Sequence, residues 1–212
     1  MDSRRAESFS DGVFAVAITV LVFNLLSVHQ PGSYKALLAA WPQYAAYVVS
    51  FLTIGIMWLN HHTMLSHVST VDRVMLVLNT FLLMGVVAVP FPTALVAEGL
   101  APAAPAGAAR VAAVTYGLVL TATSIAFCGM WLYVSAHRQS LAARPIPVPR
   151  QATLRFSAGL IGYAAATAIA AIGVPAVALS IYGLIAVYYL FEHLPDAAGD
   201  SAAADAPPAG QP

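Results

Sequence analysis

Long apolar stretches that contain no charged residue alternate along the chain with short polar ones. Asp, Glu, Lys and Arg are absent from five stretches, residues 12–34, 36–71, 74–97, 111–137 and 156–191. Each is long enough for a membrane-spanning helix, which needs about 20 apolar residues. Their apolar positions are continuous and lack the alternation of a transmembrane β-strand, so a closed barrel is excluded. The pattern predicts an all-α integral membrane protein.

Two of these stretches decide the number of helices. Residues 36–71 begin with the polar Trp41-Pro42-Gln43 and end in a histidine-rich segment, so they predict a single span. Residues 156–191 contain Ile172-Gly173-Val174-Pro175, and glycine with proline usually separates helices. We therefore expect one six-helix unit, residues 1–194, with spans at about 9–28, 43–65, 74–97, 111–135, 153–172 and 174–193.

Composition and charge place this unit in a membrane and orient it. Of 212 residues, 60% are hydrophobic and 8% are charged, which is more apolar than a soluble globule can bury. With a cytoplasmic N-terminus, the opposite side holds only Lys35 and Arg110 as basic residues, in line with the positive-inside rule. The cytoplasmic side then holds Arg4, Arg5, Arg73, Arg138, Arg144, Arg150 and Arg155. Both termini are thus predicted to be cytoplasmic in a multi-pass cell-membrane protein, and the tail, 195–212, is predicted to be disordered.

Polar residues of the first three spans fall at one depth near the cytoplasmic face. Asp11 begins the first apolar stretch, His62 ends the second and Asn79 follows about two turns into the third, with Arg5 just below. Polar groups inside a helix bundle tend to face one another and to mark function. We expect Asp11, His62 and Asn79 to form one layer. The alternative is that Ser10 and Asp11 only begin a helix.

Enzymatic and metal chemistry are not indicated. His61 and His62 are adjacent, so on a helix they point about 100° apart, and no carboxylate accompanies them at metal-ligand spacing. No nucleophile with its base and no glycine-rich phosphate loop is found. We expect no enzyme, no metal site and no cofactor.

One face of the first span carries a stripe of mostly apolar residues. At about 100° per residue, one side of the helix carries Gly12, Val16, Thr19, Val20, Phe23 and Ser27, and Asp11 falls on another side. We call its central residues, Val16, Thr19, Val20 and Phe23, the stripe. Spacing alone favours a lipid-facing or helix-packing surface for it.

The N-terminal part of the chain resembles a known family. Residues 5–11, RAESFSD, match the R-x-x-x-F-S-D signature of the transmembrane protein 175 potassium channels, and the match continues through GVFAVAITVLV. GIMWLNHHTML in the second span, with Trp58, His61 and His62, is also similar to this family, as are Asn79-Thr80-Phe81-Leu82-Leu83 and Val89-Pro90-Phe91-Pro92-Thr93 in the third. The resemblance is specific over about residues 4–95.

The resemblance implies a function and an assembly. Four six-helix chains would surround a central pore that is lined by the first helix and selective for K⁺ over Na⁺. The apolar constriction would be formed by Val16, Val20 and Phe23, with Thr19 at the position implicated in selectivity. The expected partners are further copies of the chain and membrane lipids, with no nucleic acid. A supporting polar network would hold the first helix, and its members would be Arg5, Phe9, Ser10, Asp11, Trp58, His61, His62 and Asn79.

Two other functions stay open at this point. A proton-coupled secondary transporter or a proton leak channel would use the layer of Asp11, His62 and Asn79 as a proton relay. A non-conducting scaffold would use the stripe only for packing. Ion flux in reconstituted vesicles distinguishes the three.

Overall fold

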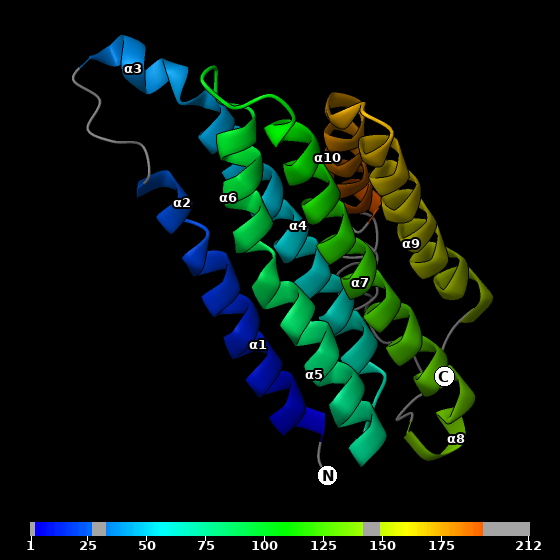
Figure 1. Cartoon of the computed structure of the whole chain (residues 1–212). Coiled ribbons are helices and arrows are strands. Elements are labelled where there is room, and N and C mark those ends of the chain that lie inside the picture. Colours follow the sequence, from blue (N-terminus) through cyan, green and yellow to red (C-terminus); the bar gives the residue numbers. More distant parts are fainter. Residues whose placement is uncertain (1–2, 27–32, 142–148, 193–212) are drawn as a thin grey trace, which may run out of the picture.

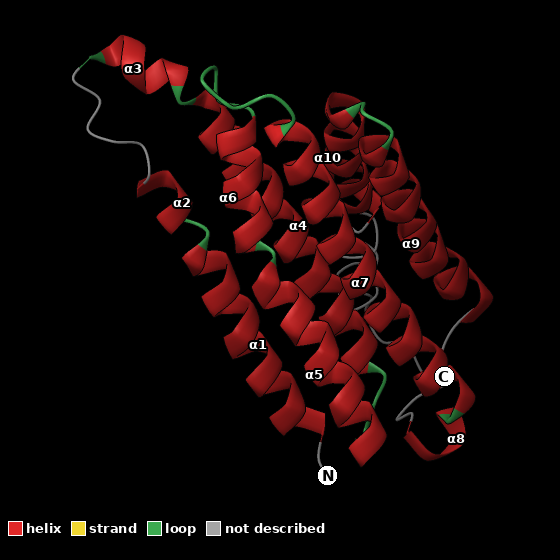
Figure 2. Ribbon diagram, viewed as in Figure 1, coloured by secondary structure: helices red, strands yellow, loops and turns green. Residues whose placement is uncertain are grey.

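The computed structural model describes residues 3–26, 33–141 and 149–192, and every regular element in these ranges is a helix (Figure 2). The all-α fold class is therefore confirmed. Residues 27, 28 and 193 of the expected spans, and the expected tail at 195–212, lie outside the described residues. The helices are α1 (Ser3–Val20), α2 (Phe23–Leu26), α3 (Tyr34–Ala39), α4 (Trp41–Ser66), α5 (Arg73–Ala88), α6 (Pro90–Gly99), α7 (Ala108–Ala136), α8 (Arg138–Leu141), α9 (Pro149–Ala171) and α10 (Pro175–Glu192).

Four helical stretches are long and apolar enough to cross a membrane. They are Ser3–Leu26, Trp41–Ser66, Arg73–Gly99 and Ala108–Ala136, and α9 and α10 add shorter apolar stretches. The long helices lie alongside one another in a bundle. In Figure 1, α1 lies at one edge of this bundle, and α9 and α10 lie at the opposite edge.

The first and third stretches each contain a break. Between α5 and α6 the cause is Pro90, which has no backbone N–H to continue the helical hydrogen bonds. Between α1 and α2, residues 21–22 form a turn, in which the Val22 N–H bonds the Thr19 carbonyl over 3.2 Å. The amide of Asn24 then donates to the carbonyl of Pro90 over 3.2 Å. The two breaks therefore lie beside each other.

Helix α7 is the centre of the bundle and contacts α5, α6, α9 and α10. Small residues permit its close packing. A Cβ on Gly117 would stand 2.0 Å from the hydroxyl of Tyr182 and 2.1 Å from that of Thr167, and a Cβ on Gly85 would stand 2.3 Å from the hydroxyl of Thr123. Tyr182 and Thr167 bond each other over 3.1 Å in the space that Gly117 leaves.

Asp72 ties the start of α5 to the end of α7. Its Oδ1 accepts the backbone N–H of Met75 over 2.8 Å as the N-cap of α5, and its Oδ2 accepts the hydroxyl of Tyr133. Both hydrogen bonds favour the ionised carboxylate. The Tyr133 hydroxyl, followed by the Met75 N–H, therefore lowers the pKa of Asp72 from its ordinary value of 3.8.

The connection between α9 and α10 follows the sequence expectation. Gly173 adopts a φ of 104°, which is open to glycine and strained for other residues, and Pro175 begins α10. Arg110 of α7 donates to the carbonyl of Ala171, the last residue of α9. A cation at this place also complements the negative end of the α9 dipole.

Candidate functional site

Helix α1 presents two different faces. Ala6, Ser10, Phe14, Ala17 and Leu21 recur every three or four residues and are buried. This face packs on α4 and α5. The stripe lies on the other side and is exposed in the single chain, with 60% of Val16, 37% of Val20 and 58% of Phe23 accessible. The neighbours of α1 in the same chain thus leave the stripe uncovered.

The stripe contains one polar group and is interrupted by the break after α1. The exposed Thr19 donates its hydroxyl proton to the Ala15 carbonyl over 2.7 Å, so its outward side offers only oxygen lone pairs. Val20 ends α1, whereas Phe23 begins α2 beyond the turn. The position of Phe23 is therefore set partly by α2 and by the contacts that α2 makes with α4 and α6.

A buried hydrogen-bond chain connects α4, α5 and α1 behind the stripe. His61 Nε2 lies 2.8 Å from Asn79 Oδ1, and Asn79 Nδ2 donates to Ser10 Oγ over 3.0 Å. Because the amide oxygen can only accept, the proton of this contact is on His61 Nε2. Ser10 itself donates to the Ala6 carbonyl over 2.8 Å, and Phe14 packs its ring 5.3 Å from that of His61. This chain of hydrogen bonds fixes α1 against α4 and α5.

The expectation that His62 joins Asn79 is wrong, because the structure places His61 there. Adjacent residues of a helix point about 100° apart, and only His61 lies on the buried face of α4. The alternative that Ser10 and Asp11 only begin a helix is also wrong, since α1 begins at Ser3. Both residues lie about two turns inside α1.

A second set of contacts joins α1 to α4 along the partly exposed edge between these two helices, which we call the rim. Trp58 Nε1 donates to Asp11 Oδ1 over 2.8 Å, and His62 Nδ1 lies 3.0 Å from Glu7 Oε1. Glu7 and Asp11 are four residues apart on α1, as Trp58 and His62 are on the antiparallel α4, so the two contacts lie one helical turn apart. The rings of Trp58 and His62 stack with centroids 6.0 Å apart. His62 and Glu7 remain 52% and 27% exposed. Asp11 and Asn79 thus belong to two separate sets of contacts, and the expected contact of Asp11, His62 and Asn79 with one another is not formed.

Not every residue of the expected network takes part, and one participant was not expected. Arg5 and Phe9 are exposed, and the hydrogen bonds and ion pairs described above do not include them. Glu7 was not foreseen, although it stands four residues before Asp11 as His62 stands four after Trp58. Among the described residues, no three His, Cys, Asp or Glu side chains group as metal ligands do.

The chain is similar to known channel proteins along almost its whole length. A family model described as Endosomal/lysosomal potassium channel TMEM175 matches residues 5–90. A potassium channel of Streptomyces collinus is 43% identical over 206 residues, which cover 95% of this chain and 98% of that protein. An endosomal/lysosomal proton channel TMEM175 of Danio rerio is 38% identical over 92 residues, which cover 38% of this chain and 18% of that protein.

A solved structure agrees with this assignment. The crystal structure of a lysosomal potassium-selective channel TMEM175 homolog from Chamaesiphon minutus has a TM-score of 0.76 and 35% identity, and the match covers 90% of this chain and 97% of that one. The fold, the N-terminal motif and the full-length similarity to a bacterial relative agree, so the chain belongs to the TMEM175 family and is a multi-pass protein of the prokaryotic cell membrane.

Proposed function

We propose that this protein is a potassium channel, a homotetramer in which α1 of each subunit lines a central pore. The observation that carries the proposal is the two-faced α1, which is anchored by polar contacts on one side and exposes an apolar stripe on the other. The similarity to a potassium channel of Streptomyces collinus over 98% of its length supports the same function. Four copies of the stripe around an axis would cover one another.

The stripe would form a hydrophobic constriction. Rings of Val16, Val20 and Phe23 make an apolar neck, which closes by dewetting or admits ions only after they lose part of their hydration. K⁺ holds its water less tightly than Na⁺, so such a neck favours K⁺. The Thr19 hydroxyl donates its proton to the Ala15 carbonyl, so its oxygen lone pairs face outward. These lone pairs would replace part of the water that K⁺ loses in the neck.

The polar contacts behind α1 would set the width of this neck. The buried chain through His61, Asn79 and Ser10 and the rim contacts of Asp11 and Glu7 hold one face of α1. Phe9 and Arg5 would lie near the pore mouth, outside this support. The protein would need no cofactor and would have no enzymatic activity, with K⁺ only passing through.

The membrane arrangement is part of the proposal. The two shorter apolar stretches in α9 and α10 would also cross, which gives six spans and cytoplasmic termini. The charge asymmetry of the sequence supports this orientation.

The test is the K⁺ over Na⁺ permeability ratio of the purified protein in planar bilayers. Wild type is expected to conduct K⁺ selectively. Val20→Asn is expected to hydrate the neck and lower the ratio. Val187→Asn is the matched control, because Val187 of α10 is 43% exposed against 37% for Val20 and lies on a helix remote from α1. An unchanged ratio in Val20→Asn would reject the stripe as the constriction, and the mass of the assembly in detergent tests for four chains.

Proton conduction is a second candidate, favoured by the similarity of 38% of the chain to a proton channel of Danio rerio. The buried contact of His61 with Asn79 supplies a group that can exchange a proton. Vesicles with an internal pH dye and an imposed pH gradient test it. Acidification that persists in His61→Gln would exclude His61 from the path.

A further inference from the structure

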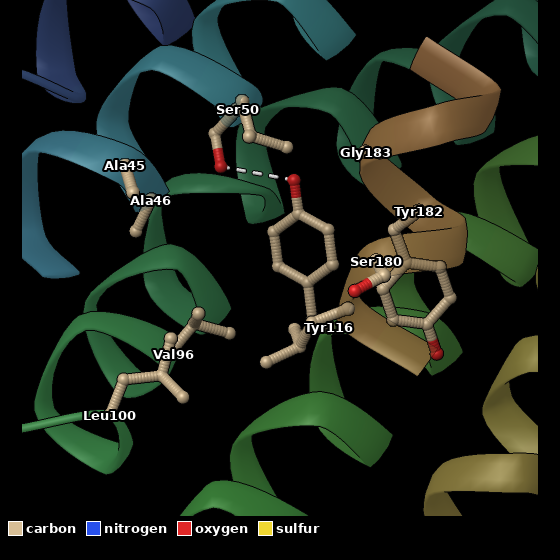
Figure 3. Close-up of a pocket in the computed structure, with 11 residues that line it drawn as sticks. Ala45, Ala46, Ser50, Val96, Leu100, Tyr116, Ser180, Tyr182 and Gly183 are labelled. Carbon is tan, nitrogen blue, oxygen red and sulfur yellow. Dashed lines mark hydrogen bonds between the residues drawn. The ribbon is translucent and has the colours of Figure 1, made fainter. Parts of the chain in front are cut away.

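A pocket of about 290 Å³ lies among α4, α6, α7 and α10, away from the stripe (Figure 3). Its inner wall is made by buried residues, among them Val96, Tyr116 and Tyr182. Ala45 of α4 and Ser180 of α10 line it as well and are exposed, so its mouth lies between these two helices. The volume is near the lower end of the range of about 300–1,000 Å³ for ligand sites.

Every hydroxyl group that lines the pocket is already hydrogen-bonded within the protein. Tyr116 bonds Ser50 over 3.0 Å, as Figure 3 shows, and Ser50 also bonds Thr93 over 2.8 Å. Tyr182 donates to the Ala113 carbonyl and Ser180 donates to the Ala176 carbonyl. A buried water needs two to four polar partners, and the remaining lining is Ala, Val, Leu and Gly. The pocket therefore suits hydrocarbon and does not suit water or a polar ligand.

The depth of the mouth matches the upper part of a lipid chain. Trp41 begins α4 and is 57% exposed. Exposed tryptophans are enriched at the headgroup level of a membrane, so we place the start of α4 there. Ala45 follows one helical turn later, about 6 Å deeper at 1.5 Å per residue. The small residues Ala45, Ala46 and Gly183 leave room there. A hydrocarbon chain of the adjacent leaflet lies at this depth.

We propose that the pocket is a lipid-binding site that holds an acyl chain of a phospholipid from the leaflet at the α4 N-terminus. The chain passes between α4 and α10 and lies against the rings of Tyr116 and Tyr182. The site is independent of the proposed pore, because it is built by other helices and holds whether or not the protein conducts.

The experiment uses the full-length protein in vesicles of phosphatidylcholine that carries a photoreactive diazirine on one acyl chain. After irradiation, mass spectrometry locates the lipid adducts. Tyr116 is 4% exposed and is reached only from inside the pocket, whereas Leu118, two residues on, is 58% exposed and serves as the internal reference. Wild type is expected to carry adducts at Tyr116 or Val96 as well as at Leu118.

A filling variant tests the site itself. Gly183 lines the pocket and a Cβ there meets nothing within 4 Å, so Gly183→Leu adds a large side chain at the pocket wall from a position where its Cβ is unobstructed. Gly129→Leu is the matched control, because its Cβ also meets nothing and it lies outside the pocket. Adducts at Tyr116 and Val96 are expected to be lost in the first variant and kept in the second, with both variants eluting as wild type does.

Three results would overturn the proposal. Tyr116 and Val96 could stay unlabelled in wild type while Leu118 is labelled. Their labelling could persist in Gly183→Leu. Loss of labelling at Tyr116 and Val96 in Gly183→Leu could also come with a changed mass of the assembly. That result would show that another copy of the chain, and not a lipid, covers the pocket.

Discussion

The most apolar parts of Ser3–Leu26, which includes α1, and of α7 have similar hydropathy, but they differ in how much of them the rest of the chain buries. The most apolar part of α7 is 44% buried within the chain, against 22% for the stretch of α1 and α2. Helix α7 contacts neighbours around it through closely packed small residues, whereas α1 packs on α4 and α5 with one face. Apolarity alone thus does not distinguish a scaffold helix from one whose outer face is left for another use.

The two helices are also held by different forces. Around Gly117 of α7, side chains of α9 and α10 fill the available space, so shape decides the packing. Helix α1 is fixed by the polar chain from His61 through Asn79 to Ser10, which specifies one rotation of the helix. A helix held by a few directed contacts can be displaced by breaking them.

The largest effect on stability is expected from Gly117→Ala. The new methyl group would collide with the hydroxyls of Tyr182 and Thr167, and overpacking of this kind costs about 1–3 kcal/mol. Thermal unfolding in detergent is the measurement. Gly12→Ala in α1 is the matched control, because its Cβ meets nothing within 4 Å, and it should unfold at or above the wild-type temperature, since alanine favours a helix interior over glycine. Equal unfolding temperatures for both variants would contradict the contrast between α1 and α7.

Asn79→Ala should remove the buried attachment of α1. It leaves the His61 N–H without its partner, whereas Ser10 keeps its hydrogen bond to the Ala6 carbonyl, and an unsatisfied buried group costs about 1–3 kcal/mol. Chemical unfolding gives the free energy. Thr80→Ala, at the exposed neighbour, is the control. Replacing both partners, His61→Leu with Asn79→Leu, should recover part of the loss, and a double variant weaker than Asn79→Ala would argue against this account.

Asp72→Asn should change how stability depends on pH. The pKa of Asp72 is lower in the folded protein than in the unfolded one, so its contribution is present above the ordinary value of 3.8 and is lost as pH falls below it through the folded pKa. The difference in unfolding temperature between wild type and Asp72→Asn should therefore shrink as pH is lowered through this range. Tyr133→Phe should behave similarly, and a difference that is constant with pH would refute the charge-dependent contact.

The smallest effect is expected from Glu7→Gln. The partly exposed pair of Glu7 with His62 should contribute about 0.2–1 kcal/mol, as surface ion pairs do, and less at high salt. A double-mutant cycle with His62→Gln at low and high salt measures the coupling. A coupling that does not respond to salt would mean that packing of the His62 ring on Trp58 holds this rim instead.

Much of the fold could be predicted because lipid imposes simple rules. Uncharged stretches of sufficient length indicate the long helices, and Gly173 with Pro175 marks the turn before α10. The break at Leu21 and Val22 contains neither glycine nor proline and depends on tertiary packing beside α6, so no local pattern announces it. Pro90 could have indicated the other break.

The site was predicted less completely than the fold. Depth along the helices predicted a layer of Asp11, His62 and Asn79. Asn79 instead bonds Ser10 and His61, the chain neighbours of Asp11 and His62, because depth does not fix the rotation of a helix. The buried positions of α4, including Ile54, Met57 and Met64, share a face with His61 and could have identified it. The contact of Glu7 with His62 could not be predicted without knowing the register in which α1 and α4 pack as antiparallel helices.

The turn at Leu21 and Val22 divides the first span into two helical segments, α1 and α2. A rigid rod would transmit any rotation of its cytoplasmic half to its far end, whereas a joint relieves that torque. The Asn24 side chain beyond the joint bonds the Pro90 carbonyl and α2 contacts α4 and α6, whereas α1 packs on α4 and α5, so Phe23 and Val20 are held by different sets of contacts. In the proposed tetramer, the rings of Val20 and Phe23 would therefore be positioned by different parts of the protein.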